Sequence, residues 1–108
     1  MIKRNCTYHI SKDRIDRATY IMTTIGIGEI VKEQRTIQED GRISWTCVTD
    51  TGVILVLSED KSVCITLYIA KQAKVSALYE GKTPHWLWKI VQRNKPLAEM
   101  QNKVKMEY

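Results

Sequence analysis

Three strand-like segments separated by short turns limit what this chain can fold into. The segments are residues 43–47, 53–57 and 63–69, which either alternate apolar and polar side chains or run continuously apolar. Asp50-Thr51-Gly52 and residues 58–62 supply the turns between them. Because parallel neighbours need a crossover of a dozen or more residues, such short connections predict an antiparallel meander. Thr36-Ile37, before the turn signal Glu39-Asp40-Gly41, is expected to add an edge strand.

Helical sequence flanks these strands on both sides. Ser11 is a good N-cap for a helix that starts at Lys12 and breaks near Gly26, whereas residues 25–31 suit a second short helix or a first strand equally well. Later helices are expected over residues 70–80 with Gly81 at C′, from Thr83 (N-cap) and Pro84 (N1) to Asn94, and beyond Pro96. The chain is therefore predicted to be a single α+β domain with a helical N-terminus (1–28), a three- to four-stranded antiparallel sheet (36–70) and a helical C-terminus (71–108).

The charge of the chain is uneven. Its 17 Lys and Arg against 12 Asp and Glu give a net charge of +5, which excludes an acidic DNA mimic. Residues 1–20 and 71–108 carry +3 and +5, and residues 21–70 carry −3. The basic ends would form one phosphate-binding patch if they met in space, and otherwise they are solvated helix faces. No apolar run is long enough to span a membrane and no secretory signal is recognised, so a cytoplasmic protein is expected.

The cysteines indicate neither disulfides nor metal. Cys6, Cys47 and Cys64 form no CxxC pair, and only His9 and His85 are present to complete a metal site. An odd number of cysteines in a chain expected to be cytoplasmic favours reduced thiols, mostly buried in strands. We therefore predict no metal and no cofactor.

The first candidate site lies at the N-terminal helix. His9, Lys12, Arg14 and Arg17 place an acid or base and several cations within two turns, which is the chemistry that cleavage of RNA by its 2′-hydroxyl requires. Tyr68, on the less apolar face of the last strand, is a candidate for orienting a phosphate. The alternative is an ordinary surface helix and a packed tyrosine.

The second candidate site lies on the helix after Pro84. His85, Lys89 and Arg93 are four residues apart and share one face, with Trp88 beside them. Phosphate contacts and base stacking would use such a row in nucleic-acid binding. The alternative is that the tryptophan packs in the core and the cations are solvated.

Two short motifs resemble a known group of proteins. Residues 10–17 are similar to the opening of the first helix, and Cys64-Ile65-Thr66-Leu67-Tyr68 to the closing strand, of a small branch of the barnase/EndoU/colicin/RelE group of RNases and toxins. The resemblance covers residues 9–70 and implies metal-independent RNA cleavage on the exposed face of the sheet. Arg17 matches a spaced arginine of that branch, whereas Asp13 stands where the branch has a histidine, so that His9 would have to replace it.

These observations lead to two hypotheses about function. The first is a small basic RNA-binding protein of RelE-like build from a phage or mobile element, with RNA preferred to DNA. It is either a metal-independent endoribonuclease that uses His9, Arg14, Arg17 and Tyr68, or an inactive relative. The second is a non-catalytic accessory protein or inhibitor of a host protein that forms a homodimer through the C-terminal helices.

Overall fold

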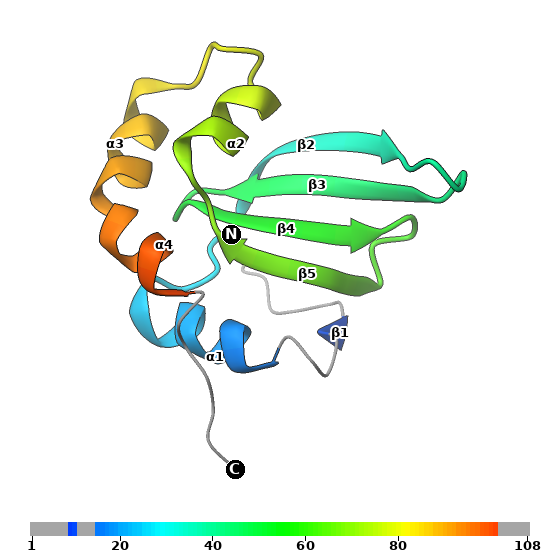
Figure 1. The fold of residues 1–108 in the computed structure, drawn as a ribbon, viewed down its shortest axis with the longest axis horizontal. Coiled ribbons are helices and arrows are strands. Elements are labelled where there is room, and N and C mark those ends of the chain that lie inside the picture. Colours follow the sequence, from blue (N-terminus) through cyan, green and yellow to red (C-terminus); the bar gives the residue numbers. More distant parts are fainter. Residues whose placement is uncertain (1–8, 11–14, 102–108) are drawn as a thin grey trace.

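The computed structural model describes residues 9–10, by their backbone alone, and residues 15–101. The elements in chain order are β1 (His9–Ile10), α1 (Ile15–Thr24), β2 (Ile30–Ile37), β3 (Ile43–Thr49), β4 (Val53–Ser58), β5 (Val63–Ile69), α2 (Gln72–Leu78), α3 (His85–Arg93) and α4 (Lys95–Gln101). The strands form one sheet in the order β1-β5-β4-β3-β2 (Figure 1). The α+β prediction is confirmed.

The antiparallel meander β2-β3-β4-β5 follows from the short turns. Gly52 makes the β3–β4 turn possible because its backbone takes a φ of +88°, which residues with a Cβ rarely adopt. Leu55 then pairs with Cys47 on one side and Leu67 on the other. The meander begins at Ile30 rather than at Thr36, so residues 30 and 31 belong to a strand and not to a second short helix.

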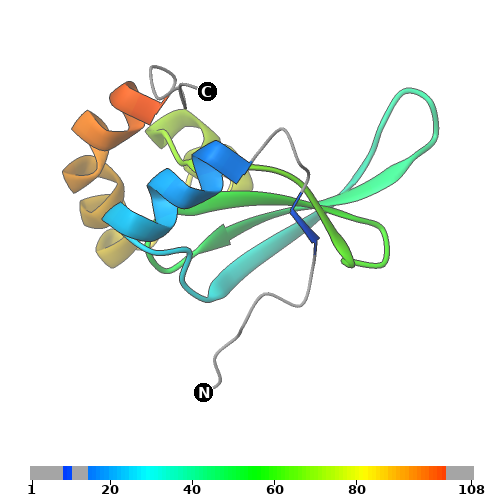
Figure 2. The same ribbon diagram turned by 90° about the horizontal axis from the view of Figure 1, so that it is seen from below.

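Helices pack on both faces of the sheet, which explains the continuous apolar run of β4. On one face, here called the α1 face, α1 and α4 cover buried side chains of three strands (Figure 2). On the other, the α2 face, α2 and α3 cover a second core. The largest members of the first core are Ile21, Leu55, Leu57, Leu67 and Ile69, and the second contains Val48, Ile54, Val75, Leu78, Leu87 and Val91. Because Leu55 and Ile54 alternate between these cores, β4 is apolar on both sides.

The helix ends differ from the prediction in two places. Glu80, with a φ of +53°, already leaves the right-handed region, so it takes the C′ position expected of Gly81. Pro84, and not Thr83, is the N-cap of α3, and its carbonyl accepts the amide hydrogens of Leu87 and Trp88. The expected start of the first helix at Lys12 lies outside the described residues. No helix in the described ranges is long and apolar enough to cross a membrane.

Candidate functional site

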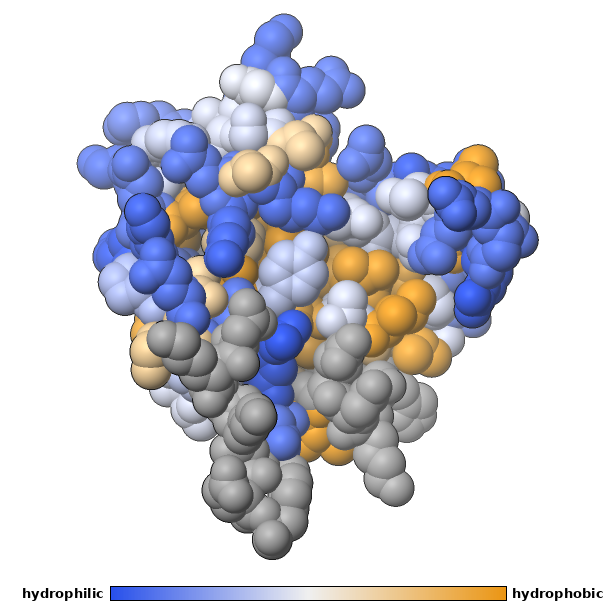
Figure 3. All heavy atoms as spheres, viewed as in Figure 1, coloured by the Kyte–Doolittle hydropathy of each residue, from blue (hydrophilic) through white to orange (hydrophobic). Residues whose placement is uncertain are grey.

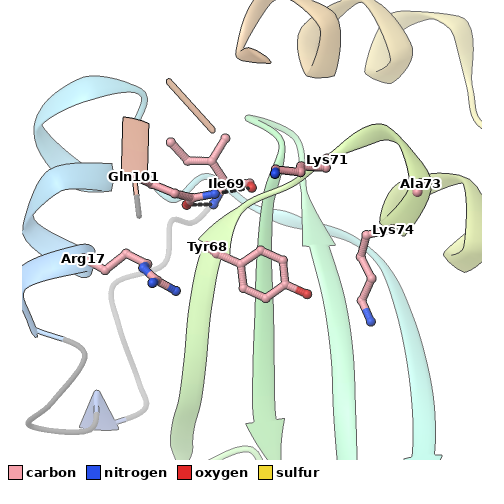
Figure 4. A pocket seen from close by; sticks show the side chains of 7 residues that line it. All are labelled: Arg17, Tyr68, Ile69, Lys71, Ala73, Lys74 and Gln101. Carbon is pink, nitrogen blue, oxygen red and sulfur yellow. Dashed lines mark hydrogen bonds between the residues drawn. The ribbon is translucent and has the colours of Figure 1, made fainter. Parts of the chain in front are cut away.

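A pocket of about 500 Å³ opens where the end of β5 meets α1, α2 and α4 (Figure 4). It is lined by Arg17, Tyr68, Ile69, Lys71, Ala73, Lys74 and Gln101. Three of these side chains are cations and one is a phenol. Arg17 comes from the basic N-terminal region, and Lys71 and Lys74 come from the basic C-terminal region. The two basic ends of the chain therefore do meet, at this pocket.

Tyr68 occupies the centre of the pocket because of its position in β5. It pairs with Ile54 and so points to the α2 face, where it packs half-buried at the border of the second core. Burial raises the pKa of the Tyr68 hydroxyl above its usual value. The phenol therefore stays protonated at neutral pH and can donate a hydrogen bond to a bound anion.

Arg17 reaches the pocket from α1. Its guanidinium lies on the β5 side of the helix and donates a long hydrogen bond of 3.5 Å to the carbonyl of Leu67 (Figure 4). This carbonyl lies next to Tyr68 in the strand, so the bond holds the cation beside the tyrosine. Arg17 and Tyr68 are the two predicted catalytic residues that the structure brings to one place.

Lys71 and Lys74 complete the cationic border of the pocket. Lys71 is the N-cap of α2, and Lys74 follows three residues later, a spacing that places both on one side of the helix. Both side chains are exposed. Neither was predicted as a site residue, although a Lys-x-x-Lys spacing directly after the strand that carries Tyr68 is the signal that would have indicated them.

Gln101 closes the back of the pocket. Its buried amide accepts a hydrogen bond from the backbone N–H of Ile69 (2.6 Å) and donates one to the carbonyl of the same residue (3.0 Å). The side chain therefore fastens the end of α4 to the outer edge of β5. Nothing in the local sequence distinguishes Gln101 from a surface glutamine.

The sheet continues past the pocket without a described helix over it, as the right side of Figure 1 shows. Figure 3 shows apolar and weakly polar side chains together on this part of the α2 face, next to hydrophilic ones. By register, this face carries Gln34, Thr46, Val56 and Thr66. Lys32 lies at its border with α2, with its ammonium 5.4 Å from the ring centre of Tyr79.

The second predicted site does not join the pocket. His85, Lys89 and Arg93 are exposed on α3 and Trp88 is half-buried, in agreement with one exposed helix face. However, α3 lies on the far side of α2 from the uncovered part of the sheet (Figure 1). This row of cations is a separate surface.

The other predicted residues of the first site are placed as follows. The backbone of His9 pairs with Val63, five residues before Tyr68 and so about 16 Å from it along the strand. Lys12 and Arg14 lie outside the described residues. The pocket therefore rests on Arg17 and Tyr68 from the prediction, together with Lys71, Lys74 and Gln101.

The cysteines of the sheet are inert by position. Cys47 and Cys64 are buried free thiols, as expected, and Cys6 lies outside the described residues. Burial, and then the negative charge of Glu33, raise the pKa of Cys47 to about 11, so its reactive thiolate is scarce at neutral pH. Among the residues that the structure describes, no three His, Cys, Asp or Glu side chains form a group that could hold a metal ion.

Comparison with protein-family models, curated proteins and solved structures gives no match. The resemblance to small RNases stays a prediction.

Proposed function

We propose that the protein binds single-stranded RNA at this pocket and along the uncovered part of the α2 face. The observation that carries the proposal is the placement of Arg17, Lys71 and Lys74 around the half-buried ring of Tyr68. Proteins that bind single strands without strong sequence preference combine cations that follow the phosphates with aromatic rings on which bases stack. Here the cations supply the first part and Tyr68 the second.

The walls of the pocket suit a nucleotide better than a free anion. The Tyr68 ring, Ile69 and Ala73 offer apolar contact to a base, and the charged ends of Lys71 and Lys74 lie at the border. A phosphate bound there would have its base within the pocket. Exposed Gln34 and Thr36 on the same sheet face offer an amide and a hydroxyl to base edges and to the 2′-hydroxyl.

The side chains that line the pocket favour binding of RNA over its cleavage. Cleavage through the 2′-hydroxyl needs a group that removes its proton. The described lining consists of a guanidinium, two ammonium groups, a phenol, an amide and apolar side chains. Because burial raises the pKa of Tyr68, the phenol is a hydrogen-bond donor and not a base at neutral pH. We therefore propose a binding protein rather than a ribonuclease.

The test is fluorescence anisotropy of a labelled single-stranded RNA titrated with the full chain across a salt series. Each phosphate contact contributes about 0.7 to the slope of log affinity against log salt. Replacing both Lys71 and Lys74 by alanine is expected to reduce that slope by about 1.4. The matched control replaces Lys89 and Arg93 on α3, which removes the same charge from the separate surface and should change the slope less.

Tyr68 allows a second arm of the same titration. Tyr68→Phe keeps the ring and should retain most of the affinity, whereas Tyr68→Ala should lose about 1–3 kcal/mol for one stacked base. DNA of the same sequence measures the preference for ribose. Salt-independent binding, or a larger effect of the α3 pair than of the Lys71 and Lys74 pair, would show that the proposed surface is wrong.

A further inference from the structure

The outer edge of β2 is the longest exposed strand edge that the structure describes. All eight residues from Ile30 to Ile37 are exposed, and among the described strands β2 pairs with β3 alone. An open strand edge presents unpaired N–H and C=O groups to other chains. Natural edge strands commonly carry charges that prevent such pairing. The charges of β2, in contrast, are arranged so that two copies of the strand complement each other.

The hydrogen bonds of β2 define which of its backbone groups point outward. Gln38 donates its N–H to the carbonyl of Arg42 (2.7 Å), in register with the ladder that pairs Ile37 with Ile43. Hydrogen-bonded and non-hydrogen-bonded pairs alternate along an antiparallel ladder. Beyond the bulge between Ile30 and Lys32, the even-numbered residues of β2 therefore bond to β3, and the N–H and C=O groups of Glu33 and Arg35 point away from the sheet.

This alternation restricts how two copies could pair. In an antiparallel pair, opposite residues must both point their backbone groups toward the partner or both away from it. An odd-numbered residue must then face an odd-numbered one. The twofold axis therefore lies midway between the two copies of one residue, which face each other across it. An axis at Glu33 opposes two glutamates and an axis at Arg35 opposes two arginines. An axis at Gln34 opposes Glu33 to the partner's Arg35, twice.

We propose that β2 pairs with β2 of a second copy of this chain, antiparallel, around a twofold axis at Gln34. The same register sets Lys32 opposite the partner's Thr36, and the bulge between Ile30 and Lys32 ends the regular pairing beyond Lys32. Glu33 already binds the Lys61 ammonium through Oε1 at 2.5 Å, which leaves Oε2 to accept from the partner's Arg35 in the proposed dimer. In the described part of the chain, Arg35 has no carboxylate within 4.0 Å.

This interface differs from the dimer predicted from the sequence, which uses the C-terminal helices. Its charged contacts are separate from the proposed RNA surface, because Glu33 and Arg35 lie on the α1 face of the sheet, opposite Cys47 and Trp45, whereas Gln34 at the axis lies on the α2 face. A variant that loses dimerisation through Glu33 or Arg35 can therefore still be tested for RNA binding, and a variant that loses RNA binding can still be tested for dimerisation.

Cross-linking at the axis tests the register. In the proposed dimer the two copies of Gln34 form a non-hydrogen-bonded pair with Cα atoms about 4.5 Å apart, within the range of about 4.4–6.8 Å for disulfides. Gln34→Cys should therefore give a disulfide-linked dimer under mild oxidation. Lys32→Cys, whose copies are about 13 Å apart along the strands, should not, and the wild-type chain measures the background from its own cysteines.

Charge exchange tests the contacts in solution by analytical ultracentrifugation. Glu33→Arg alone and Arg35→Glu alone each place like charges opposite each other twice, and should weaken the dimer by about tenfold or more. The combined variant restores both pairs and should recover the dimer, even though Lys61 then faces an arginine. Trp86→Ala, at an exposed tryptophan of α3, should leave the dimer unchanged.

Several results would overturn the proposal. The wild-type chain could stay monomeric at every concentration, or the Gln34→Cys and Lys32→Cys variants could cross-link equally. The combined charge exchange could fail to restore association, or Trp86→Ala could lose the dimer. Circular dichroism of each variant confirms that it has folded before it is scored.

Discussion

Replacing Gln101 with leucine tests how the pocket is held together. The glutamine side chain is 5 % exposed and satisfies both backbone groups of Ile69. No strand in the described part of the chain does so, since β1 pairs with β5 at Val63 and Cys64. Leucine has similar size but neither donor nor acceptor. Gln101→Leu therefore leaves a buried N–H and a buried C=O without a partner.

The expected loss of stability follows from these two groups. Each orphaned group costs about 1–3 kcal/mol, and the apolar surface gained by leucine offsets about 1–2 kcal/mol. Together these terms give a net loss between about 0 and 5 kcal/mol, with a midpoint of about 2.5 kcal/mol, from a total of about 5–15 kcal/mol for a domain of ordinary stability. Undocking of α4, which would admit water to Ile69, sets the upper limit of the loss.

Urea unfolding followed by tryptophan fluorescence measures this loss. Glu99→Gln on the exposed side of the same helix is the control and should change the free energy of unfolding by less than about 0.5 kcal/mol. Hydrogen exchange of the Ile69 amide should accelerate in Gln101→Leu and not in the control. A leucine variant as stable as Glu99→Gln would refute the reasoning that the amide clamp stabilises this edge.

Two further predictions concern the linker before β2 and the buried thiols. Gly28→Ala should lower the melting temperature more than Gly26→Ala, because both glycines have positive φ but only at Gly28 would a Cβ strike Asp50 and Thr51. Cys47 should resist maleimide in the native protein at pH 8 and react in urea. Because the pKa of the folded-state thiol is raised to about 11, burial of the neutral Cys47 thiol contributes fully to the free energy of unfolding below about pH 9. This contribution is lost as the pH rises toward 11, and the Cys47→Ala variant should not show that decline.

The strands that local sequence predicts well are those buried on one or both faces. Apolar and polar side chains alternate in β3 and β5, and β4 is continuously apolar, because cores lie against the sheet, and both patterns are visible in the sequence. The strand β2 lacks the signal, since all its residues are exposed. Its extended form depends on pairing with β3 through the turn at residues 39–41. The prediction therefore reached only Thr36-Ile37, the part closest to that turn.

For a similar reason, only some of the residues that line the pocket could be predicted from the sequence. The chemistry of Arg17 and Tyr68 identified them as candidate site residues in the sequence, but their proximity depends on the packing of α1 against β5. Lys74 and Gln101 become site residues only because α2 turns back over the sheet and α4 docks on its edge. Contacts between residues more than thirty positions apart, such as Ile69 with Gln101, leave no local pattern to read.

The two proposals together constrain how RNA would lie on the protein. A twofold axis perpendicular to the sheet keeps the α2 faces of both copies on the same side, so the two pockets share one extended surface. A strand that spans both copies should then gain affinity from its second contact. A short RNA of about 8 nucleotides, within the usual site size of one domain, should bind Glu33→Arg as tightly as wild type, because Glu33 lies on the opposite face. A longer RNA of about 24 nucleotides should bind the wild-type chain more tightly than this variant, and equal affinities would mean that the two pockets act separately.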